Sequence, residues 1–114
     1  MSKPNSYLFK GTKGELVATI ASLPPKPNKK FYENWTDITD SRAKEHSTSV
    51  TFKNNDNGLK IRFDPAEKGA PGFKGKNHYH VFNPDATGVK DRYLDKDGNP
   101  VSRNSKASHI IPES

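Results

Sequence analysis

The residues best suited to chemistry are two histidines, His78 and His80, in the segment Asn77-His78-Tyr79-His80. The segment 78–82 reads as a strand, and in a strand both imidazoles point to the same face. Their Cα atoms would lie roughly 6.5–7 Å apart, from a rise near 3.3 Å per residue. Two imidazoles at that separation can straddle a phosphodiester, one taking the proton of a ribose 2′-OH and the other protonating the departing 5′-oxygen. The pair therefore predicts acid–base cleavage of RNA.

The turn after this strand suggests a partner for His80. If residues 84–88 form the loop, Asn83 pairs with Val89 and His80 faces Arg92 across the ladder. An arginine there would bind the phosphate and stabilise the charge that develops on it. A shift of one residue would put a different side chain at this position, so the register decides whether Arg92 takes part.

Further candidates lie on either side of the strand. His109 is expected to close the site from the last strand, with Ser108 donating a hydrogen bond to phosphate. The lysines of the glycine-rich segment 72–76 resemble an anion-binding element, although such turns are common. The side chains expected to contact RNA are those of Lys74, Lys76, Tyr79, Lys90, Tyr93, Arg103 and Lys106.

Two other interpretations of the same histidines stay open. A His-x-His pair also binds transition metals, which would make the chain a metal-dependent nuclease with His109 as the evident third ligand. The histidines would instead be structural in a non-catalytic basic module that binds nucleic acid or protein. Our expectation is a site that needs no metal and no other cofactor, with the remaining histidine, His46, on the surface.

Composition favours a polyanionic partner. The 114 residues include 19 Lys and Arg against 13 Asp and Glu, for a formal net charge of +6 and a pI near 9.6. Such an imbalance suits nucleic acid, an acidic protein or an anionic membrane surface. The length predicts a single domain, and the absence of cysteine excludes disulfides and cysteine-based zinc sites. No apolar run approaches the ~20 residues of a membrane span, and residues 1–10 lack a signal-peptide pattern.

The elements that must position these side chains follow from periodicity. Apolar residues at 16, 17, 20 and 23 predict a helix from residue 13 that ends at Pro24-Pro25. A short helix over 41–45 would be capped by Thr36 or Asp37. From residue 48 the pattern alternates, and Val50, Phe52, Leu59, Ile61 and Phe63 would share one face of a hairpin that turns at 54–58.

Strands are also expected at 78–82, 90–94, 100–101 and 108–111, with a β-turn at 95–98 and Trp35 in the core. The fold class is α+β, with one or two N-terminal helices packed on a twisted antiparallel sheet of four to six strands. Residues 1–46 would form the helical and loop part, and residues 47–114 the β-rich part that carries the site.

Four segments resemble the C-terminal toxin domains of bacterial polymorphic toxins of the contact-dependent inhibition, Rhs and LXG types. They are Tyr7-Leu8-Phe9-Lys10-Gly11-Thr12, Gly75 to Pro84, Tyr93 to Pro100 and Ser105 to Ile110. The resemblance implies a domain secreted at the tip of a larger carrier protein, which would supply export, and acting in the cytoplasm of a target bacterium. A cognate immunity protein, expected to be acidic, would neutralise it.

Many such tips are ribonucleases with small α+β folds of the barnase, EndoU, colicin and RelE group, which use histidine with arginine or lysine and no metal. RNA carries its own nucleophile beside the phosphorus, so a metal-free site favours RNA over DNA. We therefore expect a monomeric endoribonuclease toxin.

Overall fold

The computed structural model describes residues 9–112. Tyr7 and Leu8, which belong to the first segment of the resemblance, lie outside the described residues. Across the described range the chain forms two α-helices and one sheet of six antiparallel strands, which follow each other in the same order in the sheet as in the chain. The predicted α+β class is therefore confirmed, with a sheet at the upper end of the expected size.

The sheet forms a meander. Its strands are β1 (Trp35–Asp37), β2 (Val50–Asn54), β3 (Lys60–Asp64), β4 (His78–Phe82), β5 (Tyr93–Leu94) and β6 (Pro100–Val101). The helices are α1 (Lys13–Ala21) and α2 (Ser41–His46), and the 3-10 turns are η1 (Phe31–Glu33), η2 (Gly72–Gly75), η3 (Val89–Asp91) and η4 (Lys106–Ser108).

The two helices are stabilised differently, since α1 is packed on the sheet and α2 is not buried. Thr12 caps α1 by accepting a hydrogen bond from the Glu15 amide, and the helix buries Leu16 and Ile20 against the sheet, as the apolar spacing predicts. None of the residues of α2 is buried, and its cap is Asp40, whose carboxylate accepts from the Ala43 amide at 2.7 Å. The expected caps were wrong because Thr36 and Asp37 are paired with β2 in the edge strand β1, which the sequence did not reveal.

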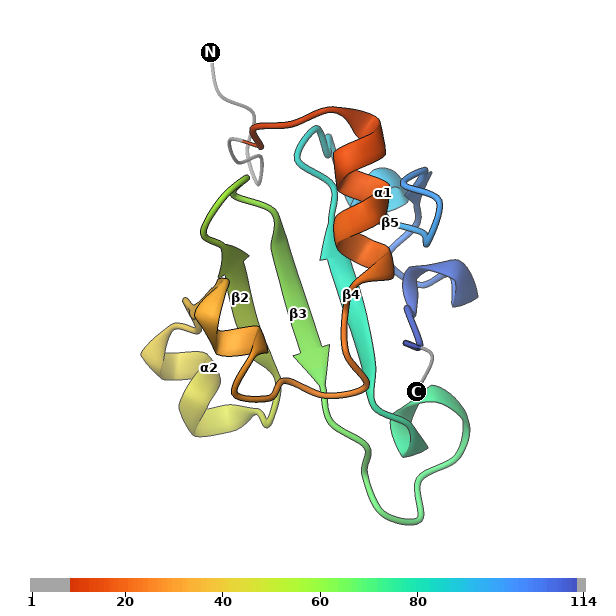
Figure 1. The fold of residues 1–114 in the computed structure, drawn as a ribbon. Coiled ribbons are helices and arrows are strands. Elements are labelled where there is room, and N and C mark those ends of the chain that lie inside the picture. Colours follow the sequence, from red (N-terminus) through yellow and green to blue (C-terminus); the bar gives the residue numbers. More distant parts are fainter. Residues whose placement is uncertain (1–8, 113–114) are drawn as a thin grey trace.

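The hairpin of β2 and β3 is confirmed with its apolar face. Val50 lies opposite Phe63 and Phe52 opposite Ile61, so all four side chains point the same way. Its turn is held by Asn54, whose side-chain oxygen accepts from the amides of residues 56 and 57. The apolar face continues on β4 and is covered by α1, which lies in front of the sheet in Figure 1. The buried core comprises Leu16, Ile20, Leu23, Phe31, Trp35, Phe52, Leu59, Ile61, Phe63, Tyr79, Val81, Leu94 and Ile110.

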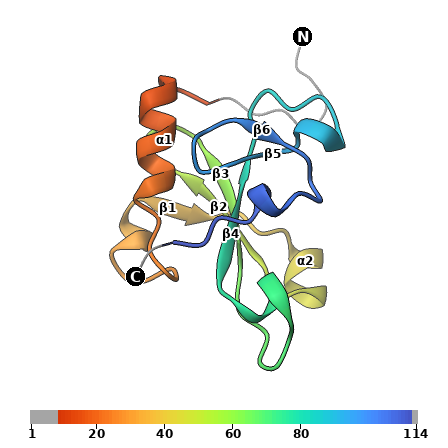
Figure 2. The ribbon, with the colours of Figure 1, turned by 90° about the vertical axis from the view of Figure 1, so that its right-hand side faces the viewer.

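The opposite face of β3 and β4 is polar. Because side chains alternate along a strand, Arg62 and Asp64 of β3 and His78 and His80 of β4 all lie on this face. Figure 2 shows α1 on one side of the sheet and α2 on the other, where the polar face lies. The fold therefore separates an apolar core from a second, polar side of the same two strands.

The end of the chain differs from expectation in two places. The segment 89–91 forms the 3-10 turn η3, so β5 is only two residues long. Near the C-terminus, residues 106–108 form η4, and the expected strand is reduced to a single bridge between Ile110 and Tyr79. The predicted turn at 95–98 is confirmed by the hydrogen bond from the Gly98 amide to the Asp95 carbonyl.

Candidate active site

The polar face of β3 and β4 forms the floor of a cleft of about 1020 Å³. Its walls come from the end of α2 and the chain that follows it, from the long loop of residues 65–77, and from the segment before η4 with His109. The lining residues are Lys44, Glu45, His46, Ser47, Thr48, Ser49, Arg62, Asp64, Pro65, Glu67, Phe73, Lys74, His78, His80, Tyr93, Arg103, Asn104 and His109.

Three histidines meet in this cleft. Strand alternation puts His78 and His80 side by side, with ring centroids 5.0 Å apart. The bridge between Tyr79 and Ile110 brings His109 beside them, at 5.0 Å from the His78 ring and 4.7 Å from the His80 ring. The structure therefore brings together all three histidines that the sequence nominated.

A carboxylate holds two of these rings. Asp64 lies opposite His78 in the β3–β4 ladder, and its Oδ2 is 3.1 Å from Nε2 of His78 and 3.3 Å from Nε2 of His80. The hydroxyl of Ser49 donates to Oδ1 at 2.7 Å. Burial alone would raise the pKa of Asp64, but hydrogen bonds from His80, Arg62 and Ser49 and the charge of Arg62 outweigh it and hold that pKa far below its usual value. Asp64 is therefore an ionised acceptor at neutral pH.

The arginine of the site is Arg62. It lies directly opposite His80, and its Nε and Nη2 each donate to a carboxylate oxygen of Asp64 at 2.9 Å. Its Nη1 donates to the hydroxyl oxygen of Tyr93 at 3.2 Å, which leaves the tyrosine O–H free to donate to a ligand. Burial would lower the pKa of Arg62, but Asp64, with Tyr93, raises it above its usual value. A fixed guanidinium of this kind suits phosphate.

The three rings differ in their hydrogen-bond partners. Nδ1 of His78 faces the Lys76 carbonyl at 2.9 Å while its Nε2 faces Asp64, so only the doubly protonated ring donates to both. His109 faces the Ser105 carbonyl through Nδ1 at 3.1 Å, and a neutral ring that donates there keeps a lone pair on Nε2.

His80 is the most enclosed of the three. Burial lowers its pKa, as do the charges of Arg62 and His109, against the opposing effect of Asp64. Its Nδ1 is buried and has no hydrogen-bond partner within residues 9–112. We therefore treat His80 as a neutral ring that donates from Nε2 to Asp64.

The loop of residues 65–77 positions an aromatic ring on the site. Phe73 stacks on His109, with centroids 4.2 Å apart and planes 13° from parallel. The glycines on either side of Phe73 have specific roles: Gly72 has a φ of 61°, which favours glycine, and a Cβ on Gly75 would collide with the Ala70 carbonyl oxygen. This loop therefore holds Phe73 where it fixes the orientation of the His109 ring.

Several of the expected RNA contacts lie at the cleft and others do not. Lys74, Tyr93 and Arg103 line it. Three lysines are exposed but do not line it, namely Lys76, Lys90 and Lys106. Tyr79 is fully buried on the apolar face, where its hydroxyl donates to the Pro24 carbonyl, so the expectation that it contacts RNA is wrong.

Two of the expected catalytic residues are also displaced. Ser108 is fully buried, and its hydroxyl donates to the Ser105 carbonyl at 2.7 Å, so it serves the local turn and not a ligand. Arg92 lies outside the lining of the cleft, because the Asn83 amide donates to the Arg92 carbonyl and Phe82 pairs with Tyr93. The cause is Asp91, whose carboxylate accepts from the amides of Thr87 and Gly88 and builds η3 into the connection.

Sequence reasoning missed Arg62, Asp64 and Ser49. The signal was present in part, because the alternation that put Ile61 and Phe63 in the core also put Arg62 and Asp64 on the other face. What was missing was the pairing of β3 with β4 across a connection of 13 residues. His46 is exposed, as expected, but it also lies at the cleft.

Comparison of the chain with protein-family models, with curated proteins and with solved structures finds no match. No helix in the described part of the chain is long and apolar enough to cross a membrane. The geometry of the cleft and the resemblance to polymorphic-toxin tips are therefore what bears on the function of the domain.

Proposed function

We propose that this domain is a metal-independent endoribonuclease that cleaves RNA by attack of a ribose 2′-OH on the adjacent phosphate. The observation that carries the proposal is the pair His78 and His109, whose rings lie 5.0 Å apart in one cleft with opposite hydrogen-bond settings. His78 is held by two acceptors as a proton donor, and His109 keeps a free lone pair. RNA needs only such a pair, because its nucleophile is already beside the phosphorus.

The proton transfers follow from these settings. Nε2 of His109 accepts the proton of the 2′-OH as the O2′–P bond forms. The P–O5′ bond breaks, and the departing oxygen replaces Asp64 as the acceptor of the Nε2 proton of His78. The products are a 2′,3′-cyclic phosphate and a free 5′-OH, and exchange with water restores both rings.

The other residues of the floor act on charge and position. Arg62 and the free O–H of Tyr93 face the cleft as donors for the phosphate oxygens, where charge develops during attack. Asp64 and His80 are positioning residues, because Asp64 orients Arg62 and both histidines of β4. Proton exchange between His78 and His80, the pair expected from the sequence, is less favoured. Nε2 of His80 is paired with Asp64, and its Nδ1 is buried.

The biological setting rests on the resemblance to polymorphic toxins. In that setting the domain is a toxin tip of a larger secreted carrier and acts in the cytoplasm of the target bacterium. The net charge of +6 supports both an RNA substrate and an acidic immunity protein. Covering the cleft is the direct way for such a protein to block activity.

One alternative has a specific observation in its favour. His78, His80 and His109 each offer a nitrogen within 4.8 Å of the others, which would also suit a metal-dependent nuclease. The non-catalytic binding module has only the basic charge in its favour. The first experiment must separate all three.

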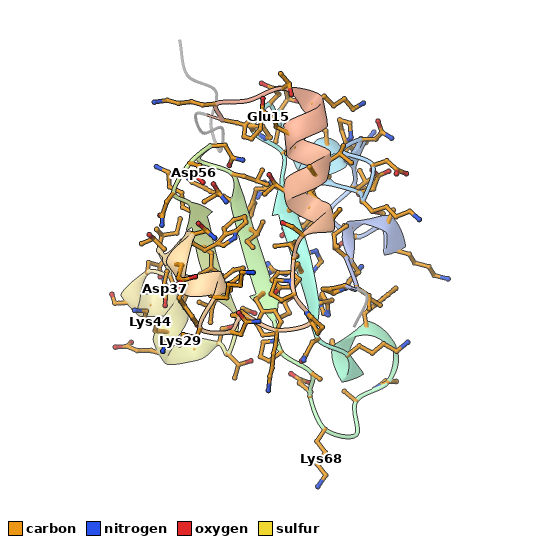
Figure 3. All side chains as sticks on the ribbon, in the orientation of Figure 1. Glu15, Lys29, Asp37, Lys44, Asp56 and Lys68 are labelled. Atoms are coloured by element: carbon orange, nitrogen blue, oxygen red, sulfur yellow. The ribbon has the colours of Figure 1, made fainter. Side chains whose placement is uncertain are left out.

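Purified protein is incubated with total bacterial RNA in excess EDTA, beside His78→Ala, His80→Ala and His109→Ala. The control is Lys68→Ala, which changes a lysine that projects from the tip of the 65–77 loop (Figure 3) and does not line the cleft. We expect fragments ending in 2′,3′-cyclic phosphate, with rates about 10²–10⁴-fold lower in His78→Ala and His109→Ala and unchanged in the control.

Circular dichroism of each variant shows whether it is folded. Cleavage that disappears in EDTA would replace the proposal with metal-dependent hydrolysis. If the folded protein binds RNA but leaves it intact both with and without EDTA, the non-catalytic binding module would be the remaining interpretation. Cleavage that survives in folded His109→Ala would reject His109 as the base.

A further inference from the structure

The ring nitrogens of His78, His80 and His109 are close to the geometry of a metal site. One nitrogen of each of His78, His80 and His109 lies within 4.8 Å of one nitrogen of each of the others. Tetrahedral zinc with Zn–N bonds of about 2.0–2.1 Å needs N···N distances of about 3.4 Å. The rings would have to close by about 1.4 Å at most. His109 is the ring with most freedom to do so, because it is partly exposed and lies on a loop.

Each ring also has an outer partner of the kind that metal ligands use. Histidines that bind metals almost always donate their other N–H to a carboxylate or a carbonyl, which fixes the tautomer and the ring orientation. Here the Lys76 carbonyl accepts from His78, the Ser105 carbonyl from His109 and the Asp64 carboxylate from His80. Surface histidines have no need of such a set of acceptors.

A buried atom points the same way. Nδ1 of His80 is buried without a hydrogen-bond partner in the described part of the chain, and the side chain is 5% exposed. Buried polar atoms are nearly always satisfied, so one that is not needs an explanation. A cation bound to Nδ1 would satisfy this nitrogen.

We propose that His78, His80 and His109 bind one divalent transition-metal ion of the zinc class. Three imidazoles with no thiolate suit zinc, cobalt or nickel, and not magnesium or calcium. The fourth position falls to a water from the cleft, since Asp64 is already the outer partner that accepts from His80. The ion takes the lone pairs on which proton transfer depends. Zinc therefore inhibits cleavage, a consequence that rests on the proposed function, whereas the binding itself does not.

Binding is measured without RNA. The full chain is stripped with EDTA, dialysed and titrated with Co²⁺, whose tetrahedral complexes absorb in the visible; zinc is then added to displace the cobalt. We expect one ion per chain. His109→Ala should weaken binding by more than the roughly 10–100-fold that loss of an outer partner costs. His46→Ala is the matched control, since it removes an exposed histidine of the same cleft and should bind as the unaltered protein does.

His78→Ala is a second ligand variant, and circular dichroism confirms that each protein is folded. Cobalt binding by folded His109→Ala and His78→Ala that equals binding by the unaltered protein, or a stoichiometry well below one, would overturn the site. So would a loss of binding in His46→Ala alone.

The activity arm separates this site from the ribonuclease. If one zinc binds and RNA stays intact in EDTA, the metal site stands and the metal-independent ribonuclease fails. If RNA is cut in EDTA and zinc neither binds nor inhibits, the ribonuclease stands and the metal site fails. Cleavage in EDTA that falls at least tenfold once the zinc site is filled, and returns with more chelator, supports both.

Discussion

The two faces of β3 and β4 are chemically opposite, although on β4 the side chains of both faces are buried. On one face Ile61, Tyr79 and Val81 are fully buried. On the other, His78 and His80 are only 5% and 4% exposed, although both are polar. Burial of the apolar face lowers the free energy of folding directly. The polar face gains nothing from burial unless its groups find partners, and an isolated buried charge is costly.

The polar face is therefore explained by its network and not by packing. Asp64 alone accepts hydrogen bonds from Ser49, Arg62 and His78 and is paired with His80. An apolar set of similar size would stabilise a small domain at least as well. The contrast agrees with the proposed function, since one face of the strand pair packs into the core and the other lines the cleft.

The largest effect should come from breaking the apolar face. Ile61→Ala deletes a fully buried side chain and should lower the free energy of unfolding by about 2–5 kcal/mol, while Ile61→Val should cost about 0.5–1.5 kcal/mol. Urea unfolding measures both. The rate of RNA cleavage per folded molecule should stay near that of the unaltered protein. A large loss of rate in folded Ile61→Val would show that the two faces are not separable.

Arg62, the next residue in the chain, lies on the polar face and tests that face. Arg62→Lys keeps the charge but loses the planar fork that bonds both oxygens of Asp64. We expect cleavage to slow by about 10²–10³-fold, as when a preorganised donor to the transition state is removed. The free energy of unfolding should change by about 1 kcal/mol, less than in Ile61→Ala. Single-turnover cleavage and urea unfolding of one preparation provide the two readouts, and a normal rate would remove Arg62 from the mechanism.

Local patterns predicted the strands that hold the site but not their neighbours. The bounds of β4, the β2–β3 hairpin and its apolar face follow from alternation and turn residues, which act over a few positions. Alternation also made the shared face of His78 and His80 predictable. These features depend only on residues close in the chain.

Such local patterns could not predict the register of β4 with β5, or the pairing of β3 with β4 across a long connection. Asn83 faces Arg92 and not Val89, three residues further along than a simple hairpin loop implies, because Asp91 folds the connection into η3. Arg62 meets His80 only through pairing across the long 65–77 loop. The sequence thus nominated histidines that meet in the cleft and an arginine that does not line it. His78 and His80 share a strand, whereas their arginine partner depends on which strand lies next to it.

The smallest effect is expected at the rim of the cleft, where two lysines of one loop can be compared. Lys74 and Lys68 stand on the same loop, but only Lys74 lines the cleft, and Lys68 points away from the molecule (Figure 3). If RNA follows the cleft, Lys74→Ala should weaken binding of a single-stranded RNA several-fold and reduce the slope of log K against log salt by about 0.7, the value for one phosphate contact on a single strand. Lys68→Ala should leave the slope unchanged, because a charge on the loop tip adds to the general field without holding a particular phosphate. Fluorescence anisotropy over a salt series, with the non-cleavable 2′-deoxy analogue of the RNA, measures both slopes. Equal slopes for the two variants would mean that RNA is drawn to the net charge of the domain and not guided along the cleft.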